Sequence, residues 1–315
     1  MGSGGRPPPT RRPVVLDHDG GVDDYLATAL LLTMDHVDLL GVVVTPADCY
    51  VEAAVGATRK LLDLAGRPDL PVARSTVRGV NPFPRRYRRD SLTVDALPVL
   101  NERGEPRIRL AAEPGQDFLA RLLLEAPEPA TVLVTGPLTT LAAALDAAPG
   151  IEAKIAEVVW MGGALDVAGN VDPGFEPGHD MSAEWNAYWD PFAVARVWQT
   201  GLRLVVCPLD VTNRVPVTPA FLAELSARRR YPLSDFAGQC YALVVHSGYC
   251  FWDVLTTAYL GRPDLFTVSQ RETVVVTEGR SQGRIAPAAG GRAVHALSDV
   301  DVEGFLAYVL RQWER

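Results

Sequence analysis

The sequence is poor in two features that assign many proteins to a class: paired cysteines and excess positive charge. It has four cysteines in 315 residues and no Cys-X-X-Cys pair, so neither a zinc knuckle nor a dithiol redox site is indicated. We expect buried thiols at Cys49, Cys207, Cys240 and Cys250. Lysine and arginine number 30 against 38 aspartates and glutamates, a net charge of −8. This balance argues against a nucleic-acid polymer or an anionic membrane as partner, but not against a small nucleotide-like ligand.

Long apolar runs are also missing. The most apolar stretch, residues 25–40, is broken by Asp35, His36 and Asp38, and no uninterrupted run reaches the roughly 18–20 residues of a membrane span. Residues 1–12 are rich in glycine, proline and arginine and have no apolar core, which predicts a disordered tail and no secretory signal. We therefore expect a cytoplasmic protein without a membrane partner.

Short apolar runs alternate along the chain with stretches of helical pattern. The predicted strands are residues 13–16, 39–45, 131–135, 157–161 and 203–207, and the predicted helices are residues 22–34, 51–65 and 138–147. This alternation is typical of an α/β fold, an open, mostly parallel central sheet with flanking helices. Because no linker-like stretch divides the chain, residues 13–315 are expected to form a single domain.

Two segments are predicted as loops. Residues 77–110 are rich in arginine and proline, and residues 166–183 are rich in glycine and proline. Loops of this length in compact α/β domains tend to be lids or walls of sites. The arginines of the first segment are expected to form a solvated basic surface, with a mobile lid as the alternative: Arg85, Arg86, Arg88 and Arg89.

Four aspartates, Asp17, Asp19, Asp23 and Asp24, lie within eight residues where the first strand passes into a helix. Ligands of open α/β sheets bind at the carboxyl ends of strands, so the place suits a site. Carboxylates this close repel unless a cation neutralises them, and oxygen ligands without a histidine or cysteine pair favour calcium or magnesium over zinc. Helix capping accounts for one or two such aspartates but not for four.

Two other acidic-loop families fit less well. An EF-hand loop starting at Asp17 needs glutamate at its twelfth position, where this sequence has Thr28. A phosphatase of the haloacid dehalogenase type stays a minor alternative, because Gly20 and Gly21 stand where that family places threonine or valine.

Four motifs, in order, resemble those of the nucleoside hydrolase family, the inosine-uridine preferring nucleoside hydrolase superfamily. They are residues 15–24, residues 134–139, residues 161–163 with 169–171 and 183–186, and Trp252-Asp253 with Ala258-Tyr259. Residues 47–52, 80–84 and 188–191 are similar to the purine-specific (inosine-adenosine-guanosine) branch. The resemblance covers most of the chain and implies the Rossmann-like fold of that family.

The resemblance implies a role for each polar motif residue. Calcium is expected to bind Asp19, Asp24, the carbonyl of Thr135 and Asp253, with Asp19 also acting as general base on a calcium-bound water. Asp17 is expected to support the acidic loop. The expected substrate-binding residues are Asp23 and Asn186 for the 2′ and 3′ hydroxyls, Asn170 and Glu184 for the 5′ hydroxyl, and Trp185 and Met161 in the pocket lining.

The leaving base is expected to be activated by stacking. Many family members carry a histidine where this sequence has Trp252, as the purine-specific branch does, and Tyr87 stands where that branch has tryptophan. Aromatic rings on both faces of a purine make it easier to protonate, and the smaller ring of Tyr87 predicts weaker activation or broader specificity. Asp48 is a further marker of the purine branch and an expected catalytic contributor. His246 is a minor alternative contributor, whereas His18 is expected to point into the core.

The sequence therefore predicts calcium-dependent hydrolysis of purine ribonucleosides to free base and ribose, in a cytoplasmic homodimer that serves purine salvage. The open alternatives are a broad or pyrimidine-preferring hydrolase and a non-catalytic, calcium-dependent protein that binds nucleosides or ribose.

Overall fold

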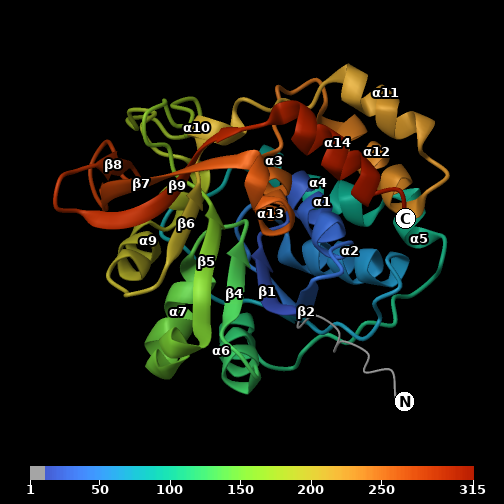
Figure 1. Ribbon diagram of the computed structural model, residues 1–315, viewed down its shortest axis with the longest axis horizontal. Coiled ribbons are helices and arrows are strands. Elements are labelled where there is room, and N and C mark those ends of the chain that lie inside the picture. Colours follow the sequence, from blue (N-terminus) through green and yellow to red (C-terminus); the bar gives the residue numbers. More distant parts are fainter. Residues whose placement is uncertain (1–10) are drawn as a thin grey trace, which may run out of the picture.

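The computed structural model describes residues 11–315 and is built on one nine-stranded sheet (Figure 1). The strands are β1 (Arg12–His18), β2 (Val37–Val44), β3 (Val72–Arg74), β4 (Ala130–Val134), β5 (Ile155–Met161), β6 (Leu204–Cys207), β7 (Phe266–Val275), β8 (Ile285–Pro287) and β9 (Arg292–Val300). Their order across the sheet is β3-β2-β1-β4-β5-β6-β9-β7-β8. Only β7 is antiparallel to its neighbours, β8 and β9. The predicted open, mostly parallel sheet is confirmed.

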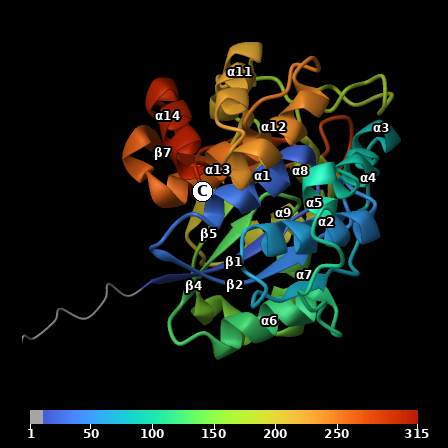
Figure 2. The same cartoon turned by 90° about the vertical axis from the view of Figure 1, so that its right-hand side faces the viewer.

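Helices cover both faces of the sheet (Figure 2). One face carries α1 (Val22–Leu31), α2 (Val51–Leu64), α12 (Pro232–Val244), α13 (Trp252–Gly261) and α14 (Val302–Gln312), and the other carries α6 (Gly115–Glu125), α7 (Thr139–Ala147) and α9 (Pro191–Trp198). The shorter helices are α3 (Arg85–Arg88), α4 (Asp90–Asp95), α5 (Pro98–Asn101), α8 (Trp185–Trp189), α10 (Leu209–Thr212), α11 (Pro219–Ala227), η1 (Pro149–Lys154) and η2 (Pro263–Leu265). Within residues 11–315, no helix has both the length and the apolarity needed to cross a bilayer.

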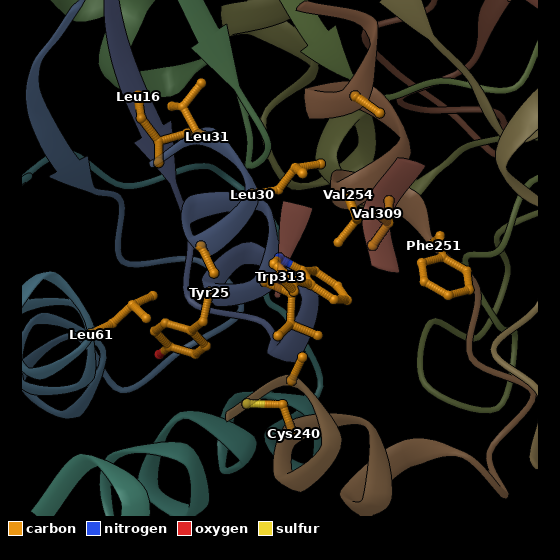
Figure 3. Close-up of a cluster of buried hydrophobic side chains, with 14 of the residues drawn as sticks. Leu16, Tyr25, Leu30, Leu31, Leu61, Cys240, Phe251, Val254, Val309 and Trp313 are labelled. Carbon is orange, nitrogen blue, oxygen red and sulfur yellow. The ribbon is translucent and has the colours of Figure 1, made fainter. Parts of the chain in front are cut away.

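Helix α1 lies at the centre of the larger core. All ten of its residues are buried, because apolar residues occupy every side of the helix beyond its first turn. Tyr25 and Leu30 belong to one apolar cluster with Trp313 near the end of the chain (Figure 3). The helix ends at Leu31, three residues before the predicted end, where the hydroxyl of Thr33 donates to the carbonyl of Leu30 and closes the last turn.

The strand order reverses beside β1. From β1 the chain moves to β2 and β3 on one side and then returns to place β4 on the other side. Open α/β sheets bind their ligands at such a reversal, outside the carboxyl ends of the strands. The acidic segment, residues 17–24, leaves β1 at this point, and Thr135 directly follows β4. The fold therefore brings two of the sequence motifs to one place.

Residues 77–110 differ from the continuous loop that the sequence predicts, because they contain α3, α4 and α5. Helices this short are stabilised by packing and not by their own length. Here Val94 and Leu100 are buried in the core cluster that includes α2, and Pro98 occupies a first-turn position that favours helix formation. Residues 166–183 contain no helix or strand, as predicted.

The first strand begins one residue earlier than predicted. Arg12 belongs to β1, because its backbone N–H donates to the carbonyl of His36 and its guanidinium binds Thr131 and Glu157. Residues 1–10 of the predicted tail lie outside the described residues. The single sheet is consistent with one domain over residues 13–315, which stays a prediction.

Leu30 tests how much the core around α1 contributes to stability. It is fully buried, whereas Leu124 of α6 is 50% exposed. We predict that Leu30→Ala lowers the free energy of unfolding by about 2–5 kcal/mol, because it leaves a cavity in a packed core. Leu124→Ala, the same change on the surface, should cost about 0.5 kcal/mol or less. Urea denaturation measures both, and equal losses would contradict this placement of the core.

Candidate active site

Carboxylates from four parts of the chain meet where β1 and β4 end. Asp19 follows β1, Asp23 and Asp24 lie in the first turn of α1, Asp48 precedes α2, and Asp253 lies in the first turn of α13. The backbone N–H of Asp48 donates to Oδ2 of Asp19 at 3.1 Å, and the backbone N–H of Asp253 donates to Oδ2 of Asp23 at 3.0 Å. The structure thus joins the N-terminal and C-terminal motifs of the sequence.

Thr135 links β4 to this cluster. Its hydroxyl donates to Oδ1 of Asp24 at 2.5 Å, and the backbone N–H of Gly21 donates to Oδ2 of the same carboxylate at 2.7 Å. The carbonyl of Thr135 accepts a hydrogen bond from Nδ2 of Asn186 at 2.9 Å. The backbone N–H of Thr135 donates to the carbonyl of Asp17. Thr135 therefore contacts both the acidic segment and the third motif.

Asp17 and His18 lie beneath the cluster. Oδ1 of Asp17 accepts from the hydroxyl of Thr45 at 2.7 Å, while its Oδ2 is buried without a partner, and burial raises the pKa of this carboxyl to about 8. This placement agrees with the supporting role expected for Asp17. His18 is buried and its Nε2 lies 3.0 Å from the hydroxyl of Thr58, so the prediction that it points into the core is confirmed. His246 is exposed.

Burial and mutual repulsion raise the pKa of most of these carboxyl groups. Loss of hydration is the largest cause for Asp19, followed by the charges of Asp24 and Asp48. The pKa of Asp253 is raised by burial and then by Asp23, Asp24 and Asp19. The pKa of Asp23 rises only to about 6, because hydrogen bonds offset part of the cost of burial. The protein alone thus favours protonated carboxyls here, and a cation would favour the ionised forms.

The donors fit a hard divalent cation in kind. Asp19, Asp24, Asp253 and the carbonyl of Thr135 offer only oxygen, which calcium and magnesium prefer. They do not form a closed cage: within residues 11–315, no three acidic, histidine or cysteine side chains are grouped so that they could hold a metal ion. We give more weight to the donor chemistry, because carboxylates that repel one another draw together only around a cation. The ligand set stays a prediction.

Glu184 caps the N-terminus of α8. Its carboxylate accepts from the backbone N–H groups of Asn186 at 2.8 Å, Gly163 at 3.0 Å and Ala187 at 3.2 Å. Burial nevertheless raises the pKa of Glu184 to about 7, since it outweighs the hydrogen bonds that favour the carboxylate. Asn170 joins this group, because its Oδ1 accepts from the backbone N–H of Trp185 at 3.0 Å. The residues expected to bind the 5′ hydroxyl are therefore together.

Asn186 connects this group to the carboxylates. Besides the carbonyl of Thr135, its Nδ2 contacts the carbonyl of Met161 at 3.1 Å. The side-chain nitrogen therefore already has two acceptors. A substrate hydroxyl would meet the Oδ1 atom of Asn186 or share these bonds. Met161 is buried and lies in one apolar cluster with Trp252.

The two expected stacking residues lie in different apolar clusters. Tyr87 packs against Phe175 with ring centroids 5.7 Å apart and edge-on to Trp185 at 6.2 Å. Trp252 packs edge-on against Tyr249 at 4.5 Å, and its indole N–H is buried without a partner. This placement supplies an aromatic wall on each side, but stacking of a base between Tyr87 and Trp252 stays a prediction.

Sequence reasoning missed two residues of the site. The hydroxyl of Tyr249 donates to Oδ1 of Asp23 at 2.6 Å and accepts from the backbone N–H of Asp23 at 3.2 Å. Phe175, in the 166–183 loop, contacts Tyr87. The position of Tyr249 three residues before Trp252 was the available signal for the first. No local pattern marks Phe175, because its contact joins two separate loops.

Asp48 belongs to the carboxylate cluster more than to an aromatic wall. Burial, followed by the charges of Asp24, Asp90 and Asp23, raises its pKa well above the usual range, while Arg88 acts in the opposite direction. Its Oδ1 is buried without a partner and is free to bind a ligand atom. Arg88 also donates to the carbonyl of Cys49. All four cysteines are buried free thiols, as predicted.

A separate surface pocket of about 170 Å³ is lined by Asp166, Asp210 and Arg271. Its charges already have partners: Arg271 binds Asp166 at 2.6 Å, and Asp210 accepts from two backbone N–H groups. We therefore place the candidate active site at the carboxylate cluster and not in this pocket.

Comparison with known proteins agrees with this placement. Residues 14–307 match the family described as inosine-uridine preferring nucleoside hydrolase, and the chain belongs to that family. It is 31% identical to the non-specific ribonucleoside hydrolase RihC of Salmonella schwarzengrund over 95% of both chains. It is 30% identical to the pyrimidine-specific ribonucleoside hydrolase RihA of Klebsiella pneumoniae over 85% of both.

A crystal structure named as an inosine-uridine preferring nucleoside hydrolase from Bacillus anthracis is 46% identical. It superposes with a TM-score of 0.92, covering 96% of this chain and 99% of that one. Ribonucleoside hydrolase activity and the family's metal requirement follow from this membership, whereas the metal's identity and the preferred base do not.

Gly136 tests the placement of Asp19. A Cβ atom at Gly136 would lie 2.7 Å from Cβ of Asp19, whereas a Cβ atom at Gly150 would meet nothing within 4 Å. We predict that Gly136→Ala displaces the Asp19 carboxylate and lowers kcat/KM for nucleoside hydrolysis at least about tenfold. Gly150→Ala is the matched control and should keep full activity. Steady-state kinetics with a melting curve for each variant checks this, and an active Gly136→Ala enzyme would place Asp19 outside the catalytic centre.

Proposed function

We propose that the protein hydrolyses the N-glycosidic bond of purine ribonucleosides in a calcium-dependent reaction. The observation that carries this proposal is the buried carboxylate cluster at the strand reversal, with an aromatic wall on each side. Hydrolysis of a ribosyl bond passes through a state with positive charge on the sugar. Carboxylates stabilise that charge, and aromatic rings bind the leaving base.

Calcium, held by Asp19, Asp24, the carbonyl of Thr135 and Asp253, would lower the pKa of water and orient sugar hydroxyls. Asp19 then accepts the proton of the attacking water. Its Oδ2 already accepts the backbone N–H of Asp48, which fixes the orientation of the carboxylate. The raised pKa of Asp19 in the protein alone means that it needs a nearby positive charge to act as a base at neutral pH.

The ribose is bound by the carboxylates and amides around Thr135. Asp23 and Asn186 hold the 2′ and 3′ hydroxyls, and Asn170 and Glu184 hold the 5′ hydroxyl. Tyr249 occupies one oxygen of Asp23, so a ribose hydroxyl takes its place or shares that oxygen. Glu184 accepts three backbone N–H groups, which fixes the orientation of its carboxylate toward the sugar.

The leaving base lies between Trp252 and Tyr87, with Asp48 close enough to the cluster to exchange a proton or hydrogen bond with it. We favour a purine because a bicyclic base uses two aromatic walls more fully than a pyrimidine does. A broad specificity is the second candidate, supported by the phenol ring of Tyr87 in place of an indole and by the names of the relatives. Cytoplasmic location, a homodimer and a role in purine salvage remain predictions.

An assay panel tests the reaction and its metal. We predict release of reducing sugar from inosine, adenosine and guanosine at rates at least about tenfold above those for uridine and cytidine. A chelator should abolish all activity, and added calcium should restore it, because Asp19 is otherwise protonated. Equal rates with uridine would overturn the purine preference, and full activity with chelator would overturn the metal requirement.

Asp19→Asn separates catalysis from binding in the same panel. It keeps the size of the side chain but cannot accept the proton, so hydrolysis should fall at least about a hundredfold while inosine binding by calorimetry persists. A wild-type protein that binds ribose or nucleosides without hydrolysing them would favour the non-catalytic alternative.

Tyr87 tests the second aromatic wall. We predict that Tyr87→Ala lowers kcat/KM for inosine about tenfold, because stacking on one base contributes roughly 1–3 kcal/mol. Tyr87→Trp should equal or exceed the wild type with purines. The kinetic constants of both variants on inosine and uridine check this, and unchanged rates in both would remove Tyr87 from the site.

A further inference from the structure

The turn between β7 and β8, residues 276–284, reaches both walls of the proposed nucleoside pocket. It is a well-bonded hairpin turn, with the backbone N–H of Val276 on the carbonyl of Arg284 at 2.9 Å and the backbone N–H of Gly283 on the carbonyl of Val276 at 2.8 Å. Its residues are about a hundred positions from one wall and two hundred from the other, as the contacts below show. None of the sequence motifs includes it.

The first wall is the 166–183 loop. The backbone N–H of Asp180 donates to the carbonyl of Arg280 at 2.9 Å, and Nε of Arg280 donates to the carbonyl of Gly178 at 3.2 Å. Ser281 donates to the carboxylate of Asp180. The loop that carries Phe175 is thus bonded to the turn through both backbone and side chains.

His179 is the most buried of these contacts. Its Nδ1 accepts from the backbone N–H of Met181 at 3.1 Å, so the proton resides on Nε2, which donates to the carbonyl of Gln282 at 2.9 Å. The ring also packs edge-on against Tyr188 of α8 at 5.0 Å. Met181, the residue that His179 bonds, has a φ of +63°, a conformation that a non-glycine residue keeps only when its surroundings hold it.

The second wall is the segment that leads into α3 and Tyr87. Nδ2 of Asn81 donates to Oε1 of Gln282 at 3.1 Å and to the carbonyl of Tyr188 at 2.6 Å. Nε2 of Gln282 donates to the carbonyl of Thr277 in its own turn at 2.9 Å, which fixes the direction of the amide. Gln282 therefore bonds one wall with its backbone carbonyl and the other with its side chain.

The turn also lies directly on α8. Gly283 has a φ of +86°, and a Cβ atom there would lie 2.5 Å from Cα of Tyr188. Only glycine allows this approach. Because α8 begins directly after Glu184 and includes Asn186, the turn, the 5′-hydroxyl residues and both walls form one bonded unit.

We propose that His179 and Gln282 are positioning residues, which hold the two walls of the pocket at the separation that a nucleoside requires. His179 acts through the 166–183 loop on the side of Asn170 and Glu184. Gln282 acts through Asn81 on the side of Tyr87. The inference rests on the proposed function of the pocket, but the bonding of the walls to the turn can be measured without activity.

The kinetic test uses His179→Phe, which keeps a ring against Tyr188 and removes both nitrogens. We expect its KM for inosine to rise about fivefold with kcat within twofold, since one lost hydrogen bond loosens ground-state binding. Its KM for 5′-deoxyinosine should rise less than twofold, because that substrate lacks the hydroxyl that the loop residues bind. Glu278→Ala, an exposed change in the same turn, is the control and should match the wild type.

Gln282 is tested by a pair of variants. Gln282→Ala removes the acceptor of Asn81 and should raise the KM for inosine about fivefold. Gln282→Glu keeps an acceptor oxygen and should restore it to within twofold of the wild type. Equal KM increases for inosine and 5′-deoxyinosine in His179→Phe, or no rescue by Gln282→Glu, would show a general structural effect and overturn the proposal.

Hydrogen exchange separates this proposal from the proposed function. We expect faster exchange of residues 171–183 in His179→Phe and of residues 79–88 in Gln282→Ala, with the rest of each protein unchanged and Glu278→Ala like the wild type. Unchanged protection in both segments overturns the positioning role. If the wild type hydrolyses no nucleoside, the proposed function fails while this measurement still decides whether the turn holds the walls.

Discussion

Burial of several like charges at the strand reversal is the constraint on which the rest of the site depends. Asp19, Asp23, Asp24 and Asp253 are each at most 5% exposed. Ionised carboxylates so placed are costly unless hydrogen bonds or a cation compensate them. Backbone N–H groups of Gly21, Asp48 and Asp253 and the hydroxyls of Thr135 and Tyr249 supply the first kind of compensation. They leave the pKa of Asp19 and Asp253 raised, so the remaining part calls for a cation.

The fold divides this work between a rigid part and a variable part. The carboxylates stand on the ends of β1 and on the first turns of α1 and α13, and α1 is buried along its whole length. Recognition of the base falls to loops: Tyr87 follows residues 79–84, and Phe175 comes from residues 166–183. Loops are the segments that change with least cost to a core. Relatives named for non-specific and for pyrimidine-specific activity can therefore share one fold and one cluster.

The sequence predicts those parts of the molecule whose signal is local. Strands β1, β4 and β5 read as short apolar runs, and the acidic segment follows the first of them. The short helices within residues 77–110 were missed, because their stability comes from burial of Val94 and Leu100 against distant residues and not from their own pattern. Tyr249, Phe175 and Gln282 were missed for the same reason: each acts on a residue far along the chain. Only the fold brings such pairs together.

The separation between the two walls matters more than their composition for a site of this kind. A stacked base must meet both rings at van der Waals distance, and a ring displaced by one ångström contributes little. Tyr87 and Trp252 lie in different apolar clusters, so no direct packing between them sets that distance. Asn81 ties the segment before Tyr87 to α8 and to Gln282, while Trp252 opens α13 against the core. The distance between the rings is thus fixed by hydrogen bonds to an antiparallel hairpin at the far edge of the sheet, and the base preference of this chain depends on residues that never touch the base.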